Sequence, residues 1–312
     1  MKIKKSIFLL IISILILGCQ NDEPQISSNN LSTTTTESIE VVENEAQMVL
    51  LFGQSNMVGY TRFSYLSTNM PDKVEEYTTG YEDVKINFNL GGGNTSNNEF
   101  VPVKLGQGRT EESFGPEIGI AETLTKGNKK NVFLVKYAVG GTSLSSQWVS
   151  PTSMPLTQPE GGTLYKGAVE FTFSCIQQLE AQGYNPRIRA ICWMQGESDA
   201  NGSQYDYYYT LTQNFISDLR LAFDEYKINQ GIGFVDAAIA AISKWREHEA
   251  INDAKRQNAE EDPLTYFIDT NAELLTTDQE PANNPDLAHY DSVSMVKLGR
   301  LFGLSLVENF IS

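Results

Sequence analysis

The feature that most constrains the fold is an alternation of short apolar runs with longer amphipathic segments, from residue 47 to the C-terminus. The apolar runs have the length of strands and lack the strict alternation of a half-exposed sheet, which indicates strands buried on both faces. The segments between them repeat apolar residues at helical spacing. Strands that alternate with helices in this way predict a mainly parallel sheet covered on both faces, a three-layer α/β/α fold.

The expected elements follow each other without an internal repeat or a second linker, so we expect one domain over residues 46–312. Residues up to about 113 are poorly patterned after the first strand and include a Gly/Asn-rich loop at 90–98. The predicted strands are 48–52, 131–139, 188–194, 232–239 and 265–269, and the predicted helices are 115–124, 163–182, 204–226, 244–260 and 292–310.

The N-terminus has the composition of an export signal rather than of a folded element. Three lysines within the first five residues precede an apolar run, 7–17, that is too short to span a bilayer comfortably. Gly18-Cys19 closes the run and resembles the lipobox of bacterial lipoproteins, which implies a signal peptide at 1–18 and lipidation of Cys19. The alternative is an ordinary signal peptide with an incidental cysteine. Residues 19–45 are polar and predict a flexible tether, so the protein would reach the periplasmic or cell-surface face of the outer membrane through its lipid anchor alone.

Charge and cysteine content exclude several classes of protein. The chain has 23 basic and 39 acidic residues, a net charge of −16, which excludes a general binder of nucleic-acid phosphates and favours a neutral or cationic substrate. A small local basic site is still compatible with this charge, and Arg62 or Arg109 are candidates for it. Cys175 and Cys192 lack the spacing of a zinc site and lie in apolar segments, so we expect buried small hydrophobes, with a disulfide between them left open.

Polar segments directly follow three of the predicted strands. They are 53–56, 140–143 and 195–199. Functional groups in open parallel sheets collect at the carboxyl ends of the strands. We therefore expect these three segments to meet at one edge of the sheet and to form the site.

The chain has only two histidines, and one of them lies near a carboxylate. His248 belongs to a strongly polar helix and is expected at the surface. His289 precedes the last helix and follows Asp286 by three residues, so the carboxylate could orient its ring, as in a Ser-His-Asp triad. Ser55 supplies a nucleophile at a tight turn after Gly53, although a serine there also suits a helix cap.

Four segments occur in order along the chain, LFGQSNMVG (51–59), YAVGGTSLSSQW (137–148), WMQGESDA (193–200) and DLAHYDS (286–292). Together they resemble the SGNH hydrolase superfamily, in the branch of carbohydrate acetylesterases that includes sialate O-acetylesterase and acetylxylan esterases. The resemblance implies a flavodoxin-like three-layer fold and ester hydrolysis without a metal or cofactor. It covers nearly the whole domain, and the joint occurrence of four motifs in order is more specific than any one.

The resemblance implies Ser55 as nucleophile, His289 as general base and Asp286 as the third member. The oxyanion hole would use the backbone N–H of Ser55, that of Gly140 or Gly141, and the side-chain amide of Gln195. Residues expected to support the site are Gln54, Asn56 and Glu197.

The expected substrate is an acetylated polysaccharide such as acetylxylan, with O-acetylated sialic acid as the alternative. A surface glycan-binding lipoprotein without catalysis is the alternative of a different class. A lipase or thioesterase is disfavoured, because no long apolar lid is present. Sugar specificity would come from loops 60–113 and 143–162 and from the aromatic residues Trp148, Tyr205 and Tyr207. The alternative role of these aromatic residues is packing in the core.

Overall fold

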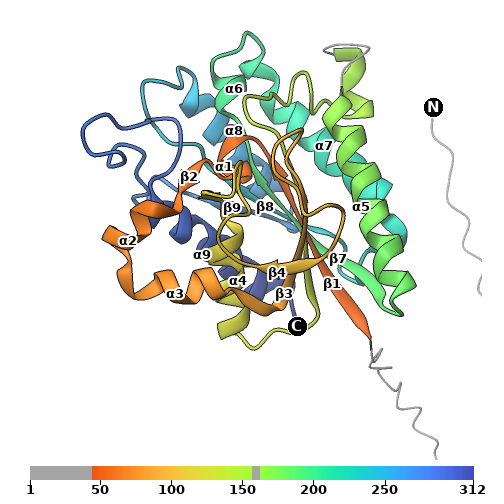
Figure 1. Cartoon of the computed structure of the whole chain (residues 1–312). Helices are drawn as coiled ribbons and strands as arrows, with labels where there is room; N and C mark the ends of the chain where they lie inside the picture. The colour runs from red at the N-terminus through yellow and green to blue at the C-terminus, as the bar shows by residue number, and fades with distance from the viewer. Residues whose placement is uncertain (1–43, 157–161) are drawn as a thin grey trace, which may run out of the picture. The chain divides into compact units, whose positions relative to one another are not determined.

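A seven-stranded sheet forms the centre of the fold, in the order β4-β3-β6-β1-β7-β8-β9 (Figure 1). All neighbouring pairs are parallel except β3 and β4, which are antiparallel. The sheet therefore confirms the predicted mainly parallel α/β architecture. Its strands are β1 (Glu45–Gly53), β3 (Tyr81–Asn89), β4 (Val101–Val103), β6 (Val132–Ala138), β7 (Asn185–Met194), β8 (Gly233–Ala237) and β9 (Thr265–Ile268).

The computed structural model describes residues 44–156 and 162–312, which belong to a unit that runs from Val42 to Ser312. β1 begins at Glu45, next to the predicted domain boundary. The predicted signal peptide, Cys19 and nearly all of the predicted tether lie outside the described residues. No helix among the described residues is long and apolar enough to cross a membrane.

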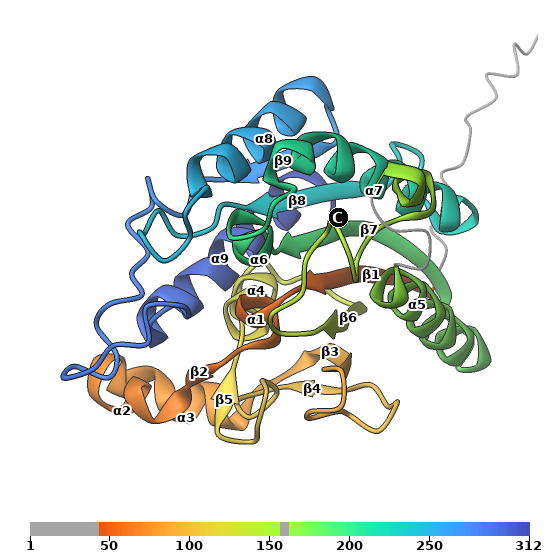
Figure 2. The same cartoon turned by 90° about the horizontal axis from the view of Figure 1, so that it is seen from above.

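Helices cover both faces of the sheet (Figure 2). Helices α4 (Glu117–Lys126) and α9 (Ser292–Asn309) pack together on one face, and α5 (Thr163–Ala181) and α7 (Tyr208–Ala222) cover the other. Helix α8 (His248–Glu261) packs against α7 and β9. The shorter helices are α1 (Ser55–Val58), α2 (Leu66–Asn69), α3 (Pro71–Thr79) and α6 (Glu197–Ala200), with 3-10 turns at Phe63–Tyr65, Pro151–Leu156, Tyr205–Tyr207 and Asp224–Tyr226.

Strand β1 forms the centre of the core because it pairs with β6 on one side and β7 on the other. Every residue from Ala46 to Gly53 is buried, as expected for an apolar strand in a parallel sheet. On the outside of the sheet, α4 and α9 approach closely at glycines: a Cβ on Gly299 would lie 2.1 Å from the carbonyl oxygen of Pro116. The apolar runs and these small residues together fix the positions of the layers.

The structure differs from the sequence expectation between residues 60 and 113. This unpatterned region contains the partly buried strand β3 and helix α3, and a two-stranded sheet forms from β2 (Thr61–Arg62) and β5 (Ser113–Phe114). β3 has a weak apolar pattern because it lies next to the edge strand and carries polar side chains, such as Asn87, which accepts a hydrogen bond from Ser96. The predicted helix at 204–226 is α7 with a 3-10 turn at each end.

The two described cysteines are buried and free, which confirms their predicted role as small hydrophobes and shows that they do not pair. Cys175 lies on α5 and Cys192 on β7. Burial raises the pKa of Cys175 to about 12, so its thiolate is scarce at neutral pH.

Candidate active site

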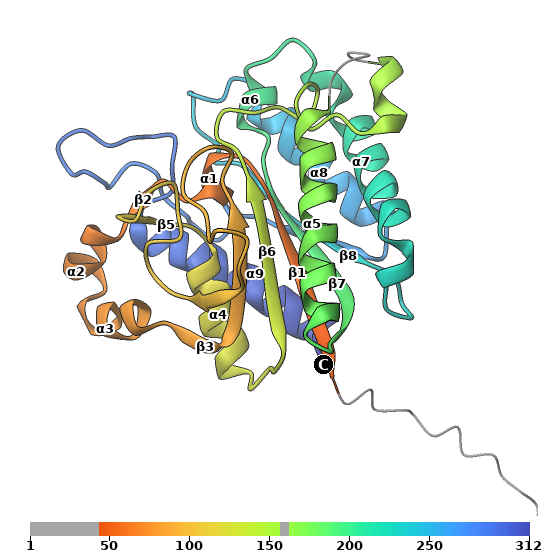
Figure 3. The same cartoon turned by 45° about the vertical axis from the view of Figure 1, so that its right-hand side comes forward.

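The ends of β1, β6 and β7 meet at one edge of the sheet, where α1 and α6 begin (Figure 3). Gln54 donates its backbone N–H to the carbonyl of Met194 at 2.9 Å, and Val139 donates to the carbonyl of Gly53 at 3.2 Å. Gly53 is required here, because a Cβ at this position would lie 2.1 Å from the Met194 oxygen. The predicted meeting of the three polar segments is therefore confirmed.

Ser55 is the first residue of α1 and is 9% exposed. Within residues 44–156 and 162–312, its Oγ atom forms no hydrogen bond. The backbone N–H groups of Ser55, Gly140 and Gly141 likewise donate to no acceptor in that part of the chain. A hydroxyl with free N–H donors nearby is the set of groups that acyl transfer to a serine needs.

Asp286 and His289 form the predicted pair. Asp286 Oδ2 lies 2.7 Å from His289 Nδ1, and its other oxygen accepts the backbone N–H of Ala288 at 3.2 Å. Leu287 has a φ of 61°, which folds this short turn back on itself. The carboxylate therefore fixes the orientation of the imidazole, whose side chain is 17% exposed.

Asn56 connects the segment that carries Ser55 to the loop that carries His289. Its Nδ2 atom donates to the carbonyl of Ala288 at 3.3 Å, and its Oδ1 atom accepts the N–H of Tyr290 at 3.1 Å. The two bonds hold the backbone on both sides of His289. No hydrogen bond joins Ser55 Oγ to the His289 ring within the described chain.

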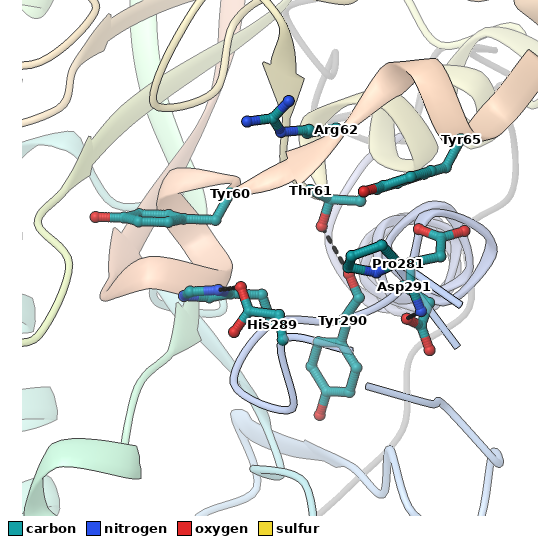
Figure 4. A pocket seen from close by; sticks show the side chains of 10 residues that line it. Tyr60, Thr61, Arg62, Tyr65, Pro281, His289, Tyr290 and Asp291 are labelled. Carbon is teal, nitrogen blue, oxygen red and sulfur yellow. Dashed lines mark hydrogen bonds and ion pairs between the residues drawn. The ribbon is translucent and has the colours of Figure 1, made fainter. Parts of the chain in front are cut away.

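A second contact strengthens the same connection. Thr61 donates its hydroxyl to the carbonyl of Tyr290 at 2.7 Å, as the dashed line in Figure 4 shows. Asn56 lies within α1 and Thr61 at the start of β2, and both bind the histidine loop. The loop is thus held against the first strand-to-helix turn by two buried side chains.

Tyr60 lies against His289 and was not identified from the sequence. The two rings are stacked with centroids 4.4 Å apart and planes 17° apart, and Figure 4 shows one above the other. The guanidinium carbon of Arg109 lies 4.6 Å from the centroid of the Tyr60 ring. The only sequence signal was its position just after the motif at 51–59.

Gln195 differs from the prediction that its amide donates to an oxyanion. The side chain is fully buried, and Nε2 lies within hydrogen-bond distance of Asp199 Oδ2 (2.6 Å), Gln54 Oε1 (3.1 Å) and the carbonyl of Thr142 (3.1 Å). An amide nitrogen has two hydrogens to donate, so both are used by protein acceptors. Gln195 instead connects the three polar segments, because its acceptors belong to all three of them. A buried amide group of this kind needs hydrogen-bond partners within the protein.

The predicted supporting role of Gln54, Asn56 and Glu197 agrees with their contacts. Gln54 accepts from the backbone N–H of Ser198 as well as from Gln195. Glu197 accepts from Asn56 Nδ2 at 2.7 Å and is 1% exposed. Burial raises the pKa of Glu197, and the hydrogen bond from Asn56 lowers it in part.

Two hollows flank Tyr60. One, of about 380 Å³, is lined by Tyr65 and His289 among others, and the second, of about 720 Å³, is lined by Arg109 among others. Both also contact Tyr60, Arg62 and Asp286. The guanidinium groups of Arg62 and Arg109 form no ion pair within the described residues, which agrees with the local basic site considered above. Glu111 and Glu112 line the second hollow as well.

The aromatic residues considered for sugar binding are placed differently from one another. Trp148 is fully buried and packs edge-on against Trp193, with ring centroids 5.2 Å apart. Tyr205 is half-buried and Tyr207 is 54% exposed. Trp148 therefore belongs to the core.

The remaining titratable groups near the site are buried acids and one predicted surface histidine. Asp236 pairs with Lys255 in the core, and its pKa is raised to about 6 by burial, partly offset by the Lys255 charge.

His248 is half-buried at the start of α8 rather than fully exposed. In the part of the chain that the structure describes, no group of three His, Cys, Asp or Glu side chains is placed to hold a metal ion.

Comparison with known proteins gives one family and several similar folds. A family model described as carbohydrate esterase, sialic acid-specific acetylesterase matches residues 45–308. A solved protein from Arabidopsis thaliana is similar, with a TM-score of 0.61 and 18% identity over 85% of this chain and 99% of that one. NanS has a TM-score of 0.60 and 15% identity over 85% of this chain and 97% of its own.

A carbohydrate acetylesterase from Xanthomonas citri has a TM-score of 0.55 and 15% identity, over 83% of this chain and 55% of its own. At these identities the solved structures establish the three-layer fold alone. No curated protein sequence matches the chain.

Proposed function

The chain belongs to the carbohydrate esterase family of sialic acid-specific acetylesterases, and from that premise we propose that it removes O-acetyl groups from carbohydrates by Ser-His-Asp catalysis. As a member of this family it is a carboxylic ester hydrolase. Membership favours an enzyme over the alternative of a glycan-binding protein without catalysis. The proposal concerns the residues that perform the reaction and the sugar that carries the acetyl group.

One observation supports the assignment of the residues above all others. Asn56, next to Ser55, binds the backbone on both sides of His289, whose Nδ1 atom lies 2.7 Å from Asp286. Asn56 thereby links the segment that carries Ser55 to the distant loop that carries Asp286 and His289, which supports the proposed roles of these three residues. Catalytic hydrogen bonds often tighten only when substrate is bound, so the free Ser55 hydroxyl is compatible with this role.

The proposed reaction proceeds through an acetyl-enzyme. His289 takes the proton of Ser55 as Oγ attacks the acetyl carbonyl carbon, and Asp286 stabilises the resulting imidazolium. The C–O bond to the sugar breaks, and the sugar oxygen leaves with the proton from His289. Water, deprotonated by His289, then attacks the acetyl-enzyme and releases acetate and free Ser55.

The negative oxygen of each tetrahedral intermediate needs hydrogen-bond donors. We assign the backbone N–H groups of Ser55 and Gly140 to this task, since both donate to no described acceptor. Gly140 is half-buried beside Tyr60, whereas Gly141 is exposed and a Cβ there would meet nothing within 4 Å. Gly140 is therefore the better candidate of the two.

The first substrate to test is an acetylated polysaccharide such as acetylxylan. The two hollows that flank Tyr60, one of them lined by His289, are open to solvent, and the chain is acidic overall, which suits a long neutral glycan.

O-acetylated sialic acid is the second candidate. Arg62 and Arg109 line one hollow and form no ion pair among the described residues, although Glu111 and Glu112 line it too. The description of the matching family also names sialic acid.

The mechanism is tested with Ser55→Ala. The purified protein should release acetate from 4-nitrophenyl acetate, and the variant should lose at least ~10³-fold in kcat. Ser203→Ala, a change at an exposed serine, is the matched control and should keep full activity. Equal rates for the wild type and Ser55→Ala would exclude the serine mechanism. Acetate release from acetylxylan and from O-acetylated sialic acid then ranks the two substrates.

We also propose that the protein is an exported lipoprotein anchored through Cys19, on the periplasmic or cell-surface face of the outer membrane. The support is the sequence of residues 1–45 alone. An acetylesterase at that position would meet glycans outside the cytoplasm.

A further inference from the structure

Tyr60 reaches from the general base to the loop that carries Gly140. Its ring stacks on His289 at 4.4 Å, and in Figure 4 its hydroxyl extends beyond the imidazole. A Cβ built on Gly140 would lie 2.5 Å from the Tyr60 hydroxyl oxygen. The phenol oxygen is therefore adjacent to the backbone of the proposed oxyanion loop.

The Tyr60 hydroxyl is a donor without a partner. It forms no hydrogen bond within residues 44–156 and 162–312, and neither do the N–H groups of Ser55 and Gly140. Tyr60 and Gly140 are half-buried rather than enclosed, so an acceptor that enters the site can reach them. They can donate to a substrate oxygen without breaking a hydrogen bond of the described chain.

The side-chain donor expected in this site is already occupied. Gln195 directs its amide to Asp199, Gln54 and Thr142, so it has no N–H left for an oxyanion. Tyr60 is the free side-chain donor that the structure places next to Gly140. A phenol is suited to this task, because it donates one strong hydrogen bond without changing its charge.

We propose that the Tyr60 hydroxyl donates a hydrogen bond to the oxyanion that forms when Ser55 attacks the acetyl carbonyl, together with the N–H groups of Ser55 and Gly140. The inference rests on the proposed serine mechanism. The phenol keeps its proton throughout, and the proton of Ser55 still travels through His289 to the leaving sugar oxygen.

The position of the donor is fixed before the reaction. The ring lies between His289 and Arg109, and Arg109 donates its backbone N–H to the carbonyl of Gly59 at 2.9 Å. Gly59 has a φ of 89°, so the chain turns sharply just before Tyr60. A donor that is already oriented needs no reorganisation when charge develops. The Arg109 guanidinium over the ring also places a positive charge close to the phenol, which favours an anion at its hydroxyl.

Tyr60→Phe tests the inference because it removes the hydroxyl and keeps the stacked ring. With 4-nitrophenyl acetate, whose leaving group has no sugar hydroxyl, we expect kcat to fall ~10- to 100-fold and KM to change less than about twofold. A trifluoromethyl ketone that forms a charged tetrahedral adduct with the serine should bind more weakly by a similar factor. Tyr184→Phe, which changes a half-buried tyrosine that lines neither hollow, should leave kcat unchanged.

An unchanged kcat or unchanged inhibitor affinity in Tyr60→Phe would overturn the inference, as would a loss confined to KM or seen only with acetylated sugars. Thermal unfolding checks that the variant keeps its fold. Ser55→Ala distinguishes a failure of the Tyr60 inference from a failure of the serine mechanism. If Ser55→Ala is inactive and Tyr60→Phe is fully active, the serine mechanism stands without Tyr60. An active Ser55→Ala would remove the mechanism itself.

Discussion

Asn56 accepts a hydrogen bond from the backbone N–H of Tyr290 at 3.1 Å, between residues 234 positions apart in the chain. The amide nitrogen of the same side chain donates to the carbonyl of Ala288 and to the buried carboxylate of Glu197. One buried side chain thus holds the histidine loop, α1 and α6 together. The position of the His289 loop relative to Ser55 depends on this amide.

Asn56→Ala should therefore lower both stability and turnover. Removing the amide leaves the Glu197 carboxylate and two backbone groups without partners, at a cost of about 1–3 kcal/mol in the free energy of unfolding. The histidine loop loses its link to α1, so we expect kcat to fall more than KM rises. Urea unfolding and 4-nitrophenyl acetate kinetics measure the two effects. Asn229→Ala, at an exposed position, is the control, and a variant with wild-type kcat would show that Asn56 does not position the base.

Asp286→Asn should reduce kcat and leave the fold intact. The asparagine can keep a hydrogen bond to His289, yet it favours the wrong tautomer and cannot stabilise the imidazolium. Because the Asp286 side chain is 47% exposed, solvent screens part of its charge, and we expect a loss of ~10- to 10³-fold rather than the largest losses known for buried triads. Steady-state kinetics measure the loss. Asp72→Asn, an exposed change, should be neutral, and full activity in Asp286→Asn would exclude Asp286 from the triad.

The stability of the α4–α9 contact should depend on pH through Glu122. Burial raises the pKa of this carboxyl, but hydrogen bonds from Arg300, Lys126 and Lys73 outweigh it and hold the pKa well below its usual value of 4.5. A depressed carboxyl pKa stabilises the folded state above the unfolded pKa, and the contribution is lost as pH falls below about 4.5. Glu122→Gln should then destabilise the protein most at pH 7 and less at pH 3, because the contribution declines from about pH 4.5 down to the lower pKa of the folded state. Urea unfolding at both pH values measures this, and an equal effect at both would contradict the assignment.

Cys19 should carry the lipid anchor. In cells that process lipoproteins, the wild type should enter the detergent phase on phase separation, and its mature N-terminal peptide should show the mass of a lipidated cysteine. Cys19→Ser should move the protein to the aqueous phase without changing its specific activity, because the active site lies in the folded domain. Detergent partition that persists in Cys19→Ser would argue for another anchor.

The sequence predicts most of the sheet because the apolar runs of β1, β6 and β7 are buried on both sides, and such strands have a strong composition signal. It does not predict β3, whose polar residues are satisfied by local partners such as Ser96. An edge-proximal strand of this kind looks like a loop when only apolar periodicity is considered.

The sequence by itself determined the three-layer order, the polar segments at the strand ends, and the Asp286–His289 pair, since a three-residue spacing is local chemistry. Only the tertiary structure decided that Gln195 turns its amide to Asp199 and that Tyr60 stacks on His289. Periodicity specifies which face of a strand or helix is buried, but it does not specify which side chains from distant segments meet there. Those contacts follow from the packing of the whole domain. They determine which hydrogen-bond donors have no acceptor in the protein and so remain available to a substrate.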